Sequence, residues 1–428
     1  MKIKSPRTCR CPSGKSQNAP SRFGAALIIG ILSFSSARLF AGPDSLFGFH
    51  FYAAGAENLM NGKQGYDVET TWVQNKTDWS DIRGKVQSAK NAGFTPIVRL
   101  NWAGGDTVPA LNDWTGRFNY AMKCQEAVQN LGDLCNIWTI GNEMNLSGEG
   151  GIPADWYLKC FNTYDANNCY TQIHNVQANA IVCMGPVAPN NADTDATGPY
   201  DHTVERWKNY WYYLVNNSGL AVDGYAIHAY GGRQGGQPGD SGYDPDPRDD
   251  LNLPYGATAD TIDVCWGFNH FRYFVDEVAT KIGDLQKPIY LTETDTGQTT
   301  SPNVSYRSGW MQNAYETIDT WNKTHFQKIK TMCWFVYDPA GAWVNYSLEA
   351  PVGNCQQAHD DYVNLTANNS YLNSSDTPDA YVYNLNVGAS VLTSSDPNQI
   401  VLGSYVGRYM SWHGEGVDWG SGGPLGTS

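Results

Sequence analysis

The sequence predicts an α/β fold of the (β/α)8 (TIM) barrel type, on two observations. Eight short apolar stretches typical of buried strands occur between residues 47 and 337, and helical patterns separate most of them. Alternating strands and helices predict a parallel sheet with crossover helices, and a closed barrel of about 250 residues accommodates eight such units. An open doubly wound sheet is disfavoured, because no G-x-G-x-x-G follows any expected strand.

The elements can be placed in order along the chain. Several helical patterns end in Gly just before the next strand, as helix C-termini often do. Only the short AENLMNGK separates the first two expected strands. Strands are expected at residues 47–53, 65–73, 95–102, 136–142, 180–187, 222–230, 287–293 and 330–337. Helices are expected at residues 78–93, 116–132, 203–219, 265–284, 306–324 and 354–365.

The two ends of the chain differ from the barrel region, which we place at residues 42–367. Residues 1–41 hold a basic region, the apolar run AALIIGILSF and then small residues, the order typical of a secretory signal peptide. An uncleaved N-terminal anchor is the alternative, although the run is short for a bilayer span. Residues 368–428 are expected to be a C-terminal extension, with strands DAYVYNLNV and VLGSYVGRYMSW on the barrel and a mobile end. We therefore expect a secreted or extracytoplasmic protein.

Charge and cysteine content narrow the function classes. Residues 1–41 contain seven of the 28 basic residues and no acidic one, which leaves 21 basic against 42 acidic residues. Such a surface repels phosphate backbones, so nucleic acid is not an expected partner. Eight cysteines remain after residue 41, and no pair has the spacing of a zinc site. Structural disulfides are expected instead, most easily within the close pairs Cys124/Cys135 and Cys160/Cys169.

Two of the apolar strands finish on a glutamate. IWTIGNE ends on Glu143 at the fourth strand, and KPIYLTE ends on Glu293 at the seventh. Functional side chains of a barrel lie at the C-terminal ends of its strands, so the two carboxylates are expected to face each other across the barrel mouth. Paired carboxylates serve glycoside hydrolysis, since one protonates the leaving oxygen while the other attacks or activates water.

With the Asn-Glu pair of GNE and the Glu of LTE, the sequence resembles clan A of the glycoside hydrolases over residues 47–342. These are retaining (β/α)8 enzymes, among them family 5-like cellulases, mannanases and xylosidases. The resemblance implies that Glu143 is the acid/base and Glu293 the nucleophile, and that Asn142 donates to the 2-hydroxyl of the bound sugar. It implies no metal and no organic cofactor.

Other strand ends fit the same resemblance. His228 and Tyr230 match a common His-x-Tyr, which implies that Tyr230 hydrogen-bonds the nucleophile and His228 lines the subsite of the cleaved sugar. Trp334 on the eighth strand would stack beneath that sugar. Arg99 would keep the nucleophile ionised by charge pairing. If Arg99 lies on the third strand, Asn101 or Trp102 is an alternative lining residue. The expected aromatic platforms at strand ends are Trp102, Trp343 and Tyr52.

Each of these residues has an ordinary alternative, since a glutamate after a strand is often a rim residue and a buried tryptophan is often core. The coincidence of several positions favours the catalytic interpretation. Glu57, Glu149, Asp295 and Asp338 are interpreted as loop groups, and the Gly/Pro/Asp-rich loop after His228 as a cleft wall or, alternatively, a calcium site.

The expected function is a secreted retaining glycoside hydrolase acting on a β-linked glycan or glycoside, with carbohydrate as its partner and no stable membrane partner. A non-catalytic carbohydrate-binding barrel and a cell-surface transglycosylase are the alternatives.

Overall fold

A computed structural model describes three parts of the chain, residues 45–189, 206–231 and 268–371. Within the last part it leaves out residues 282, 285, 296–305, 307, 326, 339–342, 344–345 and 350–354. The expected signal peptide, the loop that follows the sixth strand and the strands of the C-terminal extension lie outside the described residues.

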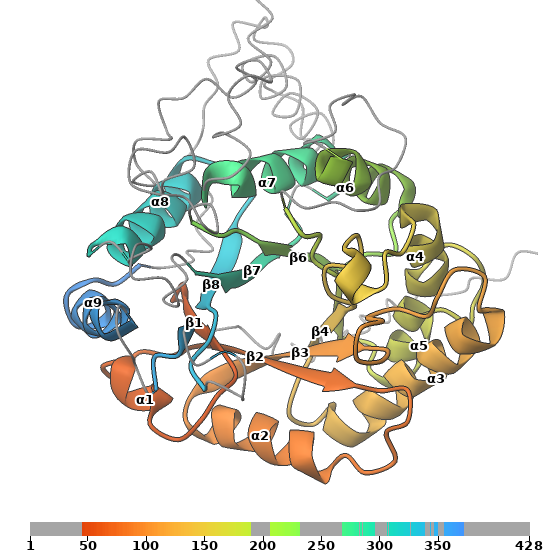
Figure 1. Ribbon diagram of the computed structural model, residues 1–428, viewed down its shortest axis with the longest axis horizontal. Coiled ribbons are helices and arrows are strands. Elements are labelled where there is room, and N and C mark those ends of the chain that lie inside the picture. The colour runs from red at the N-terminus through yellow and green to blue at the C-terminus, as the bar shows by residue number, and fades with distance from the viewer. Residues whose placement is uncertain are drawn as a thin grey trace, which may run out of the picture. The chain divides into compact units, whose positions relative to one another are not determined.

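The eight expected strands are present and form a closed parallel barrel in the order of the chain, which confirms the predicted fold. Each strand pairs in parallel with the next, and β1 pairs with β8 to close the ring (Figure 1). The strands are β1 Phe47–His50, β2 Gly65–Trp72, β3 Phe94–Asn101, β4 Ile137–Ile140, β5 Ile181–Met184, β6 Gly224–His228, β7 Ile289–Thr294 and β8 Ile329–Trp334.

Helices surround the strands on the outside (Figure 1). They are α1 Ala56–Leu59, α2 Ser80–Asn91, α3 Trp114–Leu131, α4 Ala154–Phe161, α5 Cys169–Val176, α6 Arg206–Asn217, α7 Phe271–Thr280, α8 Trp310–Thr324 and α9 Cys355–Asn368. Short 3-10 helices cover Ser147–Glu149 and Phe268–His270. Helices α1, α4 and α5 were not predicted. None of the described helices is both long enough and apolar enough to cross a membrane.

The core has two layers because side chains of each strand alternate between the barrel interior and the helices. The main cluster contains Phe49, Leu100 and Trp334 with most helix-facing residues. The interior is filled by a smaller cluster of Tyr66, Val68, Ile97, Ile137, Cys183, Tyr290 and Cys333. This alternation decides which strand-end residues reach the barrel mouth.

The expected disulfides Cys124/Cys135 and Cys160/Cys169 are wrong for the structure as described, where all four are buried free thiols. Cys135 directs its Sγ to the carbonyl oxygens of Pro96 and Ile137 near the start of β4. Cys169 begins α5, and its thiol interacts with that of Cys124. Nearness in sequence therefore does not identify the neighbouring cysteines, because α3 and α5 bring together residues 45 positions apart.

Two carboxyl groups are buried on the helix-facing side of β2. Asp67 and Glu69 are almost fully buried, and among the described residues neither Oδ atom of Asp67 has a hydrogen-bond partner. Oε1 of Glu69 accepts a hydrogen bond from the backbone N–H of Tyr52 at 3.1 Å. Burial, followed by repulsion from Glu69, raises the pKa of Asp67 well above its usual value. Burial also raises the pKa of Glu69 to about 7.

We expect Glu69→Gln to melt at a higher temperature than the wild type at pH 8, but not at pH 4. A carboxyl group whose pKa is raised by folding holds its proton more tightly in the folded state. Stability therefore falls as pH rises from the unfolded pKa, near 4.5, through about 7. Glutamine keeps the acceptor for Tyr52 and removes the ionisation.

Thermal unfolding at the two pH values measures this effect. A gain of about 1 kcal/mol corresponds to a rise of roughly 2–4 °C in a domain of about 150–250 residues, and to a smaller rise in this larger barrel. A difference that is equal at both pH values would contradict ionisation as its cause.

Candidate active site

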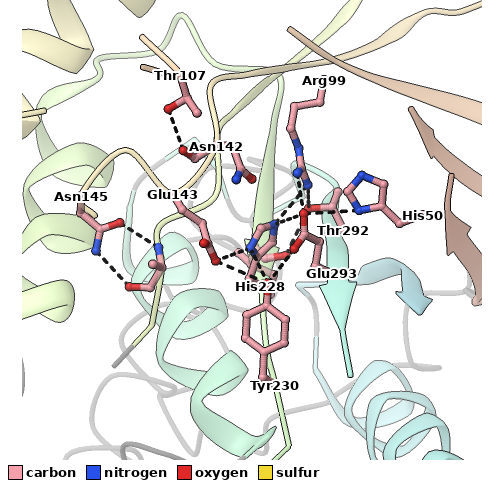
Figure 2. A network of polar contacts seen from close by, with 12 residues as sticks. His50, Arg99, Thr107, Asn142, Glu143, Asn145, His228, Tyr230, Thr292 and Glu293 are labelled. Atoms are coloured by element: carbon pink, nitrogen blue, oxygen red, sulfur yellow. Dashed lines mark hydrogen bonds and ion pairs between the residues drawn. The ribbon is translucent and has the colours of Figure 1, made fainter. Parts of the chain in front are cut away.

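The carboxyl ends of β3, β4, β6 and β7 bring five of the predicted residues together. Figure 2 shows Arg99, Glu143, His228, Tyr230 and Glu293 as one network of polar contacts. Arg99 and Glu293 are buried, whereas Glu143 is half-buried, with a side chain 16% exposed. The site therefore lies where the barrel type predicts, at the C-terminal end of the strands.

The backbone after β4 turns sharply to present Glu143. Gly141 has a φ of 78°, and Glu143 itself has a φ of 41°, a left-handed conformation that costs a non-glycine residue free energy. The N–H of Glu143 donates to the carbonyl of Pro186 at 2.9 Å. The side chain of Asn145 holds the same turn to Ala188 by two hydrogen bonds of 3.0 and 2.8 Å. The loops after β4 and β5 thus fix the position of Glu143.

Glu293 is held as an anion by its neighbours. Arg99 Nη1 lies 2.5 Å from Oε1 of Glu293, and Nδ1 of His50 lies 3.3 Å from the same oxygen. Burial alone would raise the pKa of Glu293, but the positive charge of Arg99 and the hydrogen bond from His50 lower it well below its usual value. Arg99 supplies the permanent charge, because a guanidinium does not lose its proton in proteins.

The tautomer of His228 follows from its two neighbours. Nη2 of Arg99 lies 3.2 Å from Nε2 of His228, and arginine has only donors, so Nε2 accepts. A neutral ring then carries its proton on Nδ1, which donates to Oε1 of Glu143 at 2.8 Å. His228 therefore connects Arg99, which keeps Glu293 ionised, with the second carboxylate, Glu143.

Tyr230 lies between the two carboxylates. Its hydroxyl donates to Oε2 of Glu293 at 2.6 Å and lies 3.4 Å from Oε1 of Glu143. Burial, followed by the charges of Glu143 and Glu293, raises the pKa of Tyr230 well above its usual value, so the hydroxyl stays protonated. Because both distances start at one atom, the two carboxylate oxygens are at most 6.0 Å apart, the sum of 3.4 and 2.6 Å.

Two asparagines present unused acceptors near these residues. Asn142 precedes Glu143, and its backbone carbonyl accepts from Oγ1 of Thr107 at 2.7 Å. Asn101 ends β3 on the same face as Arg99. Both side chains are at least nine-tenths buried, and within the described residues no partner reaches Oδ1 of either one. A polar ligand such as a sugar supplies the hydroxyl donors that these oxygens lack.

Two predicted substrate-binding residues lie elsewhere. Trp334 belongs to the helix-facing cluster, where its Nε1 donates to the carbonyl of Tyr346 and its ring packs against Tyr306. Trp102 is also in that cluster and packs edge to face on Tyr120 of α3. The expected platform role does not fit either position, because alternation along the strand turns both side chains away from the barrel mouth.

The residue after Trp334 takes the place expected for an aromatic platform. The ring of Phe335 lies 5.1 Å from His50, which contacts Glu293, and 5.1 Å from Trp343. Of the other two expected platforms, Trp343 is exposed, whereas Tyr52 is half-buried and its hydroxyl donates to Glu57.

Sequence reasoning missed His50 and placed Glu149 among the loop groups, although both are titratable residues of the site. His50 ends β1, and burial lowers its pKa to about 4, so the ring is neutral near neutral pH. The same strand-end criterion that found Glu143 would have found it. Glu149 follows β4, and burial, then the charges of Glu143 and Glu293, raises its pKa to about 7. Among the described residues, no group of three or more His, Cys, Asp or Glu side chains is arranged to hold a metal ion.

The chain is thus a (β/α)8 barrel with two glutamates facing each other across one tyrosine. No protein-family model and no curated protein matches the sequence. Solved structures with a similar backbone include a family 39 glycoside hydrolase from Bacteroides cellulosilyticus WH2. It is 12% identical with a TM-score of 0.49, and the match covers 77% of this chain and 64% of that protein.

Two further matches are of the same kind. An exo-beta-1,4-mannosidase from Opitutaceae bacterium strain TAV5 is 11% identical, with coverages of 76% and 59% and a TM-score of 0.43. A beta-glucosidase from Exiguobacterium marinum is 12% identical, with coverages of 76% and 98% and a TM-score of 0.43. All three are glycosidases, the class that the sequence resembles. The chain spans under two thirds of the first two, and at such identities the likenesses carry no conclusion about its substrate.

Proposed function

We propose that the protein is a retaining glycoside hydrolase that cleaves a β-linked glycan or glycoside by double displacement. The separation of the two carboxylates carries this proposal. Retaining enzymes place their carboxyl groups about 5–5.5 Å apart and inverting enzymes about 6.5–9.5 Å apart. The upper limit of 6.0 Å between one oxygen of each carboxylate, set through Tyr230, lies below the inverting range and supports retention.

In the first step Glu293 attacks the anomeric carbon while Glu143 gives its proton to the leaving oxygen. The low pKa of Glu293 supports the nucleophilic role, since the attacking carboxylate must be ionised. Glu143 is the more exposed of the two and lies on the turn after β4, where an exchanging proton and water have access. The bond to the leaving oxygen breaks as the bond between Glu293 and the sugar forms.

In the second step Glu143 takes a proton from water, which displaces Glu293 from the sugar and restores both groups. Tyr230 donates to Glu293 throughout, and Asn142 offers its amide to the sugar hydroxyls beside Glu143. No step requires a metal or an organic cofactor. Export of the enzyme belongs to the same proposal, because residues 1–41 have the order of a secretory signal.

Proton NMR of the first-formed product tests the proposal directly. The substrates are 4-nitrophenyl β-glycosides and β-linked polysaccharides of glucose, mannose and xylose. We expect the product to appear first as the β-anomer and to equilibrate afterwards, because two inversions give retention. A product that appears first as the α-anomer would contradict the double displacement. Binding of these glycans without turnover would instead favour the non-catalytic barrel, and formation of longer oligosaccharides would favour transglycosylation.

A further inference from the structure

Two exposed tryptophans flank the part of the barrel mouth beside Glu293. Trp72 is 53% exposed and Trp343 is 43% exposed, although large aromatic side chains usually bury most of their surface. Trp72 ends β2, and Trp343 follows β8. β1, which carries His50, pairs with β2 on one side and with β8 on the other. Trp343 packs on Phe335, the residue directly after β8, so the two tryptophans belong to opposite neighbours of β1.

Strand register places Trp72 at the inner lip of the barrel. Trp72 is paired with Asn101, and Thr70 is paired with Arg99, so all four share the interior face. Oγ1 of Thr70 lies 3.2 Å from Nε2 of His50, whose other nitrogen contacts Glu293. Trp72 stands two residues further along the strand, about 7 Å above Thr70. Within the described residues no aromatic ring packs on Trp72.

A polar group accompanies this exposed ring. Asn101 is 4% exposed, lies opposite Trp72 in the strand register, and has no partner for its Oδ1 among the described residues. An exposed aromatic face beside a buried unused acceptor matches a sugar unit, which offers an apolar ring face and hydroxyl donors together. An apolar protein partner would leave the Asn101 acceptor without a hydrogen bond.

Trp343, the second tryptophan, is linked through Phe335 to His50, which contacts Glu293. The ring of Phe335 lies 5.1 Å from His50 and 5.1 Å from Trp343. Aromatic side chains therefore continue from the neighbour of Glu293 outward over β8. None of these contacts involves Glu143, which lies on β4 and serves the leaving group in the proposed function.

We propose that this arm of the cleft, over β8, β1 and β2, binds at least one sugar on the non-reducing side of the cleaved unit. Trp72 and Trp343 are its stacking platforms, and Asn101 accepts from a hydroxyl. The inference rests on the proposed function, because the direction of the glycan follows from the roles of Glu143 and Glu293. It narrows the substrate to a β-linked oligosaccharide or polysaccharide, as opposed to a glycoside of one sugar.

The test compares kcat/KM for 4-nitrophenyl β-glycosides that carry one, two or three sugars, in the glucose, mannose and xylose series. We expect a second sugar to raise kcat/KM of the wild type at least tenfold in the series that it cleaves. Trp72→Ala and Trp343→Ala should each reduce this gain by about tenfold, as truncation of an aromatic ring that the bound ligand covers does. Trp72→Phe should keep most of the gain in kcat/KM, since a flat ring remains.

Trp114→Ala is the matched control, because Trp114 is also 43% exposed but lies on α3 against Trp156. It should leave the gain unchanged. The proposal that this arm binds a sugar would be overturned if the second sugar did not raise kcat/KM of the wild type. Unchanged gains in Trp72→Ala and Trp343→Ala would also overturn it.

If no glycoside is hydrolysed, the proposed function fails, and calorimetric titration tests the arm separately. The probes are unlabelled tri- and tetrasaccharides of the same three series. Loss of wild-type binding in Trp72→Ala supports the arm, whereas absent or unchanged binding overturns it.

Discussion

Replacing Glu293 by alanine should lower kcat by a factor of about 10⁴ to 10⁶ on any glycoside that the wild type cleaves. The reason is positional. Arg99, His50 and Tyr230 all converge on Glu293 at the carboxyl end of β7. Kinetics with the best substrate measures the loss, and circular dichroism shows whether the variant is folded.

Glu143→Ala should behave differently, since its role is proton transfer. Loss of a general acid costs about 10²- to 10⁴-fold with a poor leaving group. A dinitrophenyl glycoside, whose leaving group needs no proton, should form the intermediate at a nearly unchanged rate and then release it slowly. Mass spectrometry should find the sugar on Glu293, and added azide should accelerate release.

Glu57→Ala is the control for both variants. Glu57 follows a strand end like the two glutamates, but its carboxylate contacts Tyr52 and the N–H of Gly55, away from Glu293. It should keep the wild-type kcat. Full activity in either Glu143→Ala or Glu293→Ala would show that the two-glutamate assignment is wrong.

The barrel and the two glutamates could be predicted from the sequence because both depend on local patterns. A parallel strand is apolar along most of its length, so the residue at which it becomes polar marks its exposed end. Glu143 and Glu293 were found in this way. His228 and Tyr230 have a separation of two, so they share a face whatever the register of β6.

Which face a strand-end residue occupies could not be predicted in the same way. MCWFVY is apolar on both faces, so nothing local distinguishes Trp334, which packs under the helices, from Phe335, which lies beside His50. The same ambiguity affects Trp102 and Asn101. The register of a strand against its neighbours decides which face each side chain takes. The pairing of β7 with β8 shifts register between Leu291 and Thr294.

Contacts between residues far apart in the sequence could not be predicted either. The contact of His50 with Glu293 joins the first and seventh strands across the barrel interior, and the approach of Cys169 to Cys124 joins two helices. Neither has a signal in the spacing of residues along the chain. The physical reason is that closure of the barrel sets these contacts, and closure is a property of all eight strands together.

Arg99→Met should move the acidic limb of the kcat/KM profile to higher pH. In the wild type the guanidinium helps hold the pKa of Glu293 well below its usual value, so the nucleophile stays ionised in mildly acidic solution. Without that charge, burial and the loss of the 2.5 Å ion pair raise the pKa, and activity requires a higher pH. The profile should be measured on the best substrate between pH 3 and pH 9, a span of about six units around the usual carboxyl pKa.

The same substitution should destabilise the fold by about 3–5 kcal/mol near neutral pH, because it leaves Glu293 as an uncompensated buried charge. The loss should be smaller at low pH, where the carboxyl group of the variant is protonated. Arg117→Met separates the two effects, since Arg117 is equally buried but pairs with Asp165 on the outside of the barrel. It should lower stability and leave the pH profile in place. A shifted profile in Arg117→Met, or an unshifted one in Arg99→Met, would contradict the assignment of Arg99 as the group that keeps the nucleophile ionised.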